Sequence, residues 1–146
     1  GDCPIIDPEI VEQTVETFLS NKVDYLANNH IKSYPDGMDV QIFSKEILFD
    51  SYSRVKSDLE KEHVTLHIRN HPELYKHFYL IAPLELRKPN IALTLDEIDD
   101  YLFLKKITEK LYFSNKFFGL RDILNLLDEN PSFLEINSHV KRKGDN

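Results

Sequence analysis

The 146 residues match a single domain in length, and 41% hydrophobic with 29% charged residues is the composition of an ordinary globular protein. A net charge of −7 argues against a nucleic-acid-binding surface, and four glycines are too few for the usual glycine-rich phosphate loops. No apolar run reaches the roughly 20 residues of a membrane span. The single cysteine, Cys3, permits no intrachain disulfide. We therefore expect a cytoplasmic protein with no nucleic-acid or membrane partner.

The first segment is Gly1-Asp2-Cys3-Pro4, followed by a helix start at Asp7-Pro8. Asp7 suits the N-cap and Pro8 the first helical position. Asp2 is then expected on a short rigid turn before a helix, where α/β enzymes place ligand-binding groups. Gly1 is not a translation start, and no strand precedes the turn. We therefore expect this chain to be the later part of a longer protein.

Four segments are expected to be strands from their β-prone or alternating residues: 23–27, 38–42, 77–81 and 91–95. Asn28 and Asn29 follow the first of them, as polar side chains at a strand end. The last is mostly apolar, so it is expected to be buried on both faces, and it ends at Asp96. Asp96 has two interpretations, a cap for the helix that follows or a ligand-binding carboxylate.

Tyr34-Pro35-Asp36-Gly37 is a turn sequence, because proline fixes φ, aspartate caps the turn and glycine tolerates positive φ. Four helices are expected, the second capped by Ser44. Their expected core-facing residues are Ile10, Val11, Val15, Phe18 and Leu19; Ile47, Leu48, Tyr52 and Val55; Ile98, Tyr101, Leu102, Lys105 and Leu111; and Leu120, Ile123, Leu124 and Leu127. Asn130-Pro131 is expected to stop the last helix, and the basic, polar tail from residue 138 is expected to be frayed.

His63, His67 and His71 are spaced four residues apart and would share one face of a helix, the spacing of a helical zinc site. The alternative is three solvated histidines. A further interpretation is that Glu62, His63 and Thr65 form a polar cluster that faces a substrate, because carboxylate, imidazole and hydroxyl groups suit sugar hydroxyls or phosphate.

Four stretches, in this order, resemble the cytidylyltransferases that make activated sugars, above all the spore-coat polysaccharide type related to the synthetases that attach CMP to neuraminic acid and to 3-deoxy-manno-octulosonate. The stretches are Gly1-Asp2-Cys3-Pro4 with Ile6-Asp7-Pro8; Tyr34-Pro35-Asp36-Gly37-Met38-Asp39-Val40; Glu62-His63-Val64-Thr65 with Ile68-Arg69; and Leu93-Thr94-Leu95-Asp96 with Asp99-Asp100-Tyr101. The resemblance implies a three-layer, Rossmann-like α/β fold of the nucleotide-diphospho-sugar transferase kind. The strands and basic loop that hold CTP in that family are absent from this sequence, so the 146 residues alone are expected to be inactive.

The resemblance also implies the site. Asp2 and Asp96 would converge on Mg²⁺, and His63 would orient or deprotonate the sugar. The sugar side of the cleft would be lined by Asn28, Tyr34, Asp36, Gly37, Glu62 and Thr65. Cys3 is expected to be a small packing residue and not a nucleophile.

The intact protein is then expected to transfer CMP from CTP to a sugar or sugar acid, releasing pyrophosphate, for surface polysaccharide biosynthesis, with a homodimer as an open expectation. Two other functions stay open. One is a non-catalytic, truncated or degenerate module that assembles with a partner chain. The other is a metal-dependent sugar-nucleotide glycosyltransferase.

Overall fold

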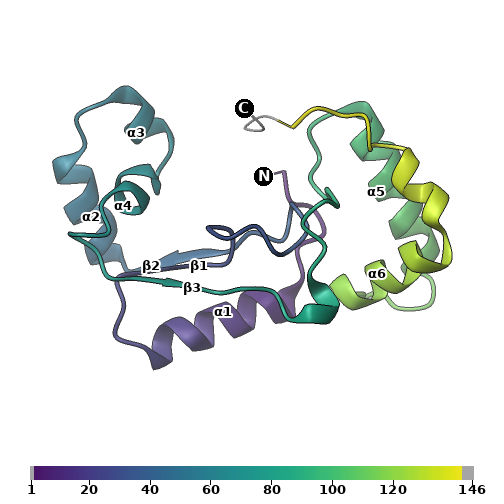
Figure 1. Cartoon of the computed structure of the whole chain (residues 1–146), viewed down its shortest axis with the longest axis horizontal. Helices are drawn as coiled ribbons and strands as arrows, with labels where there is room; N and C mark the ends of the chain where they lie inside the picture. Colours follow the sequence, from purple (N-terminus) through teal and green to yellow (C-terminus); the bar gives the residue numbers. More distant parts are fainter. Residues whose placement is uncertain (1, 143–146) are drawn as a thin grey trace.

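The computed structural model describes residues 2–142 and has a mixed α/β fold built on a small sheet of order β2-β1-β3 (Figure 1). The central strand, β1 (Tyr25–Ala27), is completely buried. It pairs antiparallel with β2 (Gln41–Phe43) and parallel with β3 (His77–Tyr79). Helix α1 (Pro8–Ser20) runs along one face of this sheet (Figure 1). The expected α/β class is thus confirmed, with shorter strands than the sequence predicts.

The remaining helices gather at the two ends of the sheet (Figure 1). One end carries α2 (Lys45–Arg54), α3 (Asp58–Glu62) and α4 (Leu66–Asn70). The other end carries α5 (Ile98–Leu111) and α6 (Leu120–Glu129), with the short 3₁₀ helices η1 (Leu84–Leu86) and η2 (Pro131–Glu135). Within the described residues, no helix combines the length and apolar character needed to cross a bilayer.

Local capping rules place the starts of α1 and α2 as the sequence predicts. Asp7 Oδ1 accepts the Glu9 N–H at 2.8 Å, and Ser44 Oγ accepts the Ile47 N–H at 3.3 Å. The second oxygen of Asp7, Oδ2, accepts the Leu120 N–H at 2.6 Å. One buried carboxylate therefore holds the first turns of α1 and α6 together, across a separation of 113 residues.

The core-facing stripe is predicted correctly for α6, where Leu120, Ile123, Leu124 and Leu127 are all buried. On α5 the predicted stripe is largely wrong. On α1 and α2 it is correct in part, because Ile10 is buried and Val11, Phe18, Ile47, Leu48 and Val55 are half-buried. Val15, Leu19, Tyr52, Ile98, Tyr101 and Leu102 are exposed, whereas the buried residues of these helices are Ile10, Thr14, Ser51, Asp100, Phe103, Leu104 and Ile107. Each of these three helices buries one polar residue, Thr14, Ser51 or Asp100. A prediction that places every polar residue on the solvent side therefore misplaces the core-facing side of the helix.

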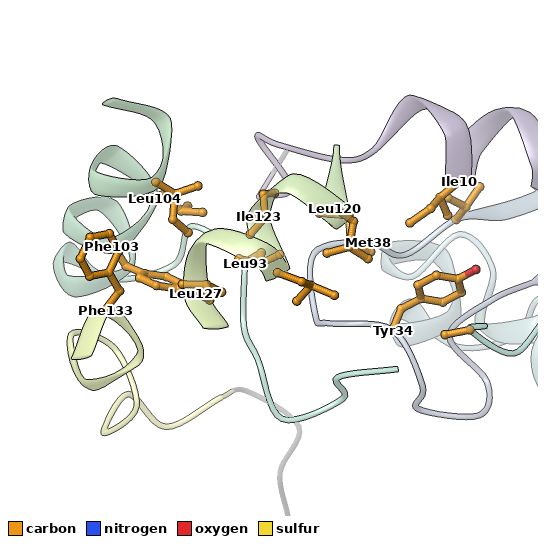
Figure 2. Close-up of a cluster of buried hydrophobic side chains, with 14 residues drawn as sticks. Ile10, Tyr34, Met38, Leu93, Phe103, Leu104, Leu120, Ile123, Leu127 and Phe133 are labelled. Atoms are coloured by element: carbon orange, nitrogen blue, oxygen red, sulfur yellow. The ribbon is translucent and has the colours of Figure 1, made fainter. Parts of the chain in front are cut away.

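The main hydrophobic core runs from α1 to the far end of the molecule (Figure 2). Ile10 packs at one end, Phe103 and Phe133 at the other, with Met38 and Leu93 between them. Each fully buried side chain of this size contributes about 1.5–3 kcal/mol of transfer free energy. A second, smaller cluster of Tyr25, Ala27, Ile68 and Tyr75 joins the sheet to α4.

The segments at 38–42 and 91–95 are only partly strands. In the first, β2 begins at Gln41, because the Val40 N–H is taken by the side chain of Asn28. The second forms an isolated parallel bridge between Asp36 and Ala92, with Leu93 buried and Leu95 exposed. Its expected burial on both faces is therefore confirmed only at its centre.

The stretch around the three histidines is two helices and not one. A capping box between Ser57 and Glu60 starts α3, which ends at Glu62, and α4 begins at Leu66. His63 lies at the C-cap of α3 with φ −97° and ψ 86°, outside helical geometry. The interpretation that His63, His67 and His71 share one helical face is therefore wrong.

Candidate functional site

Two segments that carry predicted site residues lie against the extended chain at 91–95. The Leu95 N–H donates to the Asp2 carbonyl at 2.8 Å, and the Leu93 N–H donates to the Asp36 carbonyl at 2.8 Å. Asp2 and Asp96 thus belong to neighbouring segments, although they are 94 positions apart in sequence. Both side chains are exposed at this surface.

Asp96 is not the cap of the helix that follows it. Glu97 holds the N-cap position of α5, and Asp100 Oδ2 accepts the backbone N–H groups of Asp96 (3.2 Å) and Glu97 (3.0 Å). The N-cap position that the sequence left open for Asp96 is thus held by Glu97, and the exposed carboxylate of Asp96 does not cap α5.

A group of acidic side chains surrounds the turn. Burial raises the pKa of Asp39, and the nearby charges of Asp36 and Asp2 raise it further, while a hydrogen bond from Asn29 Nδ2 (3.0 Å) lowers it. The same three aspartates act on Cys3, whose pKa rises to about 11, first through burial and then through Asp2. The thiol stays protonated at neutral pH, which fits the expected packing role and not a nucleophile.

A cavity of about 970 Å³ opens beside these aspartates. Of the predicted substrate-binding residues, Asn28, Tyr34 and Asp36 line it. Asn29, which follows Asn28 at the strand end, also lines it. The lining further includes polar side chains that the sequence did not single out for binding: Lys32, Asp39, Arg69, Asn90, Asn137 and Arg142. A mixture of acidic, amide and basic groups around one open space suits a ligand rich in hydroxyl groups.

Asn28 and Gly37 shape the loop that forms this wall. Asn28 is 1% exposed; its Nδ2 donates to the Met38 carbonyl and its Oδ1 accepts the Val40 N–H, each at 2.7 Å. Gly37 has φ +96°, and a Cβ there would lie 2.8 Å from the backbone carbonyl of Leu93. Only glycine allows the turn to approach the 91–95 segment this closely.

Glu62, His63 and Thr65 do not line the cavity. No residue of α3 is buried, and His63 lies at the C-cap of this helix. Arg69, one turn into α4 and beside the buried Ile68, is the residue of this region that reaches the cavity wall.

Asp100 and Arg142 form a buried ion pair at the base of the cavity wall. Arg142 Nη1 and Nη2 donate to the two Asp100 oxygens at 2.8 and 2.7 Å, and Asn137 Nδ2 donates to Asp100 Oδ1 at 2.9 Å. Desolvation raises the pKa of Asp100, but these hydrogen bonds and those from Asp96 and Glu97 outweigh it and hold the pKa well below its usual range. In the tail that was expected to be frayed, Arg142 is therefore held by Asp100, and His139 pairs with Asp99; residues 143–146 lie outside the described residues.

The acidic side chains at this edge are of the type that binds a magnesium ion. Asp2 and Asp96 offer carboxylate oxygens, and the charges of Asp2 and Asp36 both act on the nearby Asp39. Mg²⁺ takes oxygen ligands, commonly one or two carboxylates, and completes its shell with water and phosphates.

The fold is an α/β nucleotide-diphospho-sugar transferase fold, as a structural match supports. The solved structure of a cytidylyltransferase from Leptospira borgpetersenii serovar Hardjo-bovis matches with a TM-score of 0.84 and 29% identity, covering 97% of this chain and 58% of that one. No protein-family model matches the chain.

Two curated proteins are similar in sequence. The spore coat polysaccharide biosynthesis protein SpsF of Bacillus subtilis is 33% identical over 133 residues, which is 90% of this chain and 53% of SpsF. The uncharacterized protein MJ1063 of Methanocaldococcus jannaschii is 32% identical over 143 residues, 98% of this chain and 57% of that protein. These similarities support the resemblance to the cytidylyltransferase family that the sequence indicated. It spans a little over half the length of the relatives that it matches.

Proposed function

We propose that the intact protein is a nucleotidyltransferase that transfers CMP from CTP to a sugar or sugar acid, releases pyrophosphate and serves polysaccharide biosynthesis. The observation that carries the proposal is the pairing of the Asp2 segment with the segment that ends at Asp96. Similarity to SpsF and to a solved cytidylyltransferase supports the same reaction class.

The reaction brings a sugar hydroxyl to the α-phosphorus of CTP, where the new P–O bond forms as the bond to pyrophosphate breaks. In this proposal the cavity side chains hold the sugar. Asp36 and Asp39 accept hydrogen bonds from its hydroxyl groups, and the amide of Asn29 orients Asp39. The guanidinium of Arg69 suits the carboxylate of a sugar acid.

Asp2 and Asp96 would hold Mg²⁺, which, when bound, neutralises charge on the phosphate oxygens. Without a bound cation these carboxylates would repel the triphosphate of CTP, so the proposed transfer requires the cation. The homodimer stays a prediction, and so does the role of His63 towards the sugar, which would require contact beyond the described cavity lining.

The first test is pyrophosphate release by the intact protein from CTP and Mg²⁺ with a panel of sugars and sugar acids. We expect Asp96→Asn to keep its fold by circular dichroism and to lose most of this activity, because it loses a charged metal ligand. The matched control is Asp128→Asn, an exposed aspartate on α6 that should retain the wild-type rate.

An Asp96→Asn rate near that of the wild type would refute the metal assignment. Pyrophosphate release with none of the acceptors, together with no rise in melting temperature on adding CTP and Mg²⁺, would favour the non-catalytic module. Transfer from a CMP-sugar donor without pyrophosphate would favour the glycosyltransferase.

A further inference from the structure

Glu60 of α3, His67 of α4 and His71 at the C-cap of α4 form a cluster far along the chain from the acidic edge. One ligand atom from each of these residues lies within 4.8 Å of the others. Within residues 2–142, this is the one group of three or more His, Cys, Asp or Glu side chains with such spacing. The cluster lines a separate cavity of about 520 Å³, which shares no lining residue with the cavity beside the acidic edge.

His67 is the buried member of the cluster, with 6% of its surface exposed. Its Nδ1 lies 3.1 Å from Glu60 Oε1, and its Nε2 is buried without a hydrogen-bond partner among the described residues. Nδ1 faces Glu60 and is therefore the nitrogen that His67 offers to this cluster, whereas Nε2 lies on the other side of the ring.

His71 carries the kind of contact that orients a metal-binding imidazole. Its Nδ1 pairs with Glu73 Oε1 at 2.7 Å, and its ring centroid lies 4.3 Å from that of His67. Metal-ligating histidines usually donate their other ring N–H to a carboxylate in this way. Glu73 therefore stands to His71 as an orienting partner and leaves Nε2 as the nitrogen for an ion.

The charges around the cluster include both signs. Arg54 and Lys56 line the same cavity. Arg54 is held by both oxygens of Asp50, at 2.8 and 2.9 Å. The carboxylates of Glu60 and Glu73 are thus available to balance a divalent cation.

We propose that Glu60, His67 and His71 bind a divalent transition-metal ion, best represented by Zn²⁺, which clamps α3 onto α4. Two imidazoles and a carboxylate suit zinc and not magnesium. Bond lengths of about 2.0–2.2 Å place tetrahedral ligand atoms roughly 3.3 Å apart. His67 Nδ1 and Glu60 Oε1 are already 3.1 Å apart, so tetrahedral coordination requires movement mainly of the half-buried His71 side chain.

A clamp would serve a definite purpose at this position. Helix α3 has five residues and none is buried, so neither its length nor a hydrophobic face stabilises it. Glu60 is its link to His67, and an ion bound there would fix α3 to a helix that contributes Ile68 to the second core cluster. The inference does not depend on the proposed transferase reaction.

The experiment uses the intact protein stripped with a chelator and titrated with Zn²⁺ by calorimetry, and with Co²⁺ by visible absorption. We expect one equivalent of ion, cobalt bands of a four-coordinate site and a rise of about 5–10 °C in melting temperature at 100 times the Kd. Excess Mg²⁺ should not compete. The Asp96→Asn variant should bind zinc as the wild type does, which separates this site from the acidic edge.

Variants distinguish this site from the four-spaced histidines that the sequence suggested. Glu60→Gln and His71→Ala should each weaken zinc binding by more than about 100-fold, and Glu73→Gln by about 10- to 100-fold. His63→Ala is the matched control and should still bind one equivalent. Circular dichroism checks folding, and if either Glu60→Gln or His71→Ala fails to fold, the other decides.

The proposal is overturned if the stripped wild-type protein takes up no stoichiometric zinc. It is also overturned if Glu60→Gln and His71→Ala both bind zinc as tightly as the wild type, or if loss of binding follows His63→Ala instead. A cobalt spectrum typical of six-coordinate, water-rich binding would equally reject the clamp.

Discussion

The carboxylate of Asp7 caps two helices at once, and this makes the Asp7→Ala variant informative about the whole fold. Oδ1 accepts the Glu9 N–H of α1 at 2.8 Å, and Oδ2 accepts the buried Leu120 N–H of α6 at 2.6 Å. Replacing Asp7 by alanine removes both hydrogen bonds and leaves the Leu120 N–H without its partner.

The cost follows from these two contacts. Loss of an aspartate N-cap destabilises a protein by about 1 kcal/mol. A buried N–H left without an acceptor costs about 1–3 kcal/mol. The expected loss for Asp7→Ala is thus about 2–4 kcal/mol, a large part of the roughly 5–15 kcal/mol that stabilises a typical domain.

Gly119 offers an independent check on the same contact. A Cβ at Gly119 would lie 2.7 Å from Asp7 Oδ2, so Gly119→Ala should displace the carboxylate from Leu120. Its φ of −108° is extended backbone, so the substitution introduces no backbone strain of its own. In the Asp7→Ala background the carboxylate is gone, and the cost of Gly119→Ala should largely disappear.

The assay is urea unfolding of the wild type, the two single variants and the double variant, followed by far-UV circular dichroism. Glu12→Ala, an exposed position on α1, serves as the control and should change stability little. Additive losses in the double variant, or a loss below about 1 kcal/mol for Asp7→Ala, would refute the shared cap.

Two further predictions concern the cavity wall. Gly37→Ala should lower the free energy of unfolding by about 2–3 kcal/mol, because alanine would be strained at φ +96° and its Cβ would meet the backbone of Leu93. Urea unfolding measures this change, and a variant with the midpoint of the wild type would contradict it. Because the folded-state pKa of Asp100 is lowered, its contribution to stability is present above the unfolded-state pKa of about 3.9 and is lost as pH falls through the lower folded value. Arg142→Gln should raise the folded-state pKa of Asp100 and lower the free energy of unfolding by about 2 kcal/mol at pH 7. The urea midpoint of this variant should then fall less steeply with pH below pH 5 than that of the wild type. The same pH dependence in both proteins would contradict the ion pair between Asp100 and Arg142.

The features predicted correctly from the sequence are those that local rules decide. Asp7-Pro8 and Ser44 start helices because each side chain satisfies a backbone N–H two or three residues away. The turn at Pro35-Asp36-Gly37 follows in the same way from the backbone freedom of Gly37. Such features need no knowledge of the rest of the chain.

The errors arise where a partner distant in sequence decides the outcome. Asp100 is on the buried face of α5 because Arg142, 42 residues later, neutralises it, and no local pattern reveals this. The same contact fixes the tail that was expected to be frayed. Likewise, Ser57 and Glu60 begin α3 too early for His63 to join His67 and His71.

The candidate site was found mainly through resemblance. Asp2 and Asp96 are ordinary exposed aspartates by composition and spacing, and only the pairing between their segments brings them near each other. Arg142 and Lys32, which line the cavity, had no signal in the sequence beyond their charge.

Arg142 also acts as an internal counterion for the acidic edge. The charges of Asp36 and Asp96, besides that of Asp100, raise its pKa, so its guanidinium offsets some of the repulsion among these carboxylates. Any change to the cavity wall that removes this cation would therefore increase the negative potential at the acidic edge.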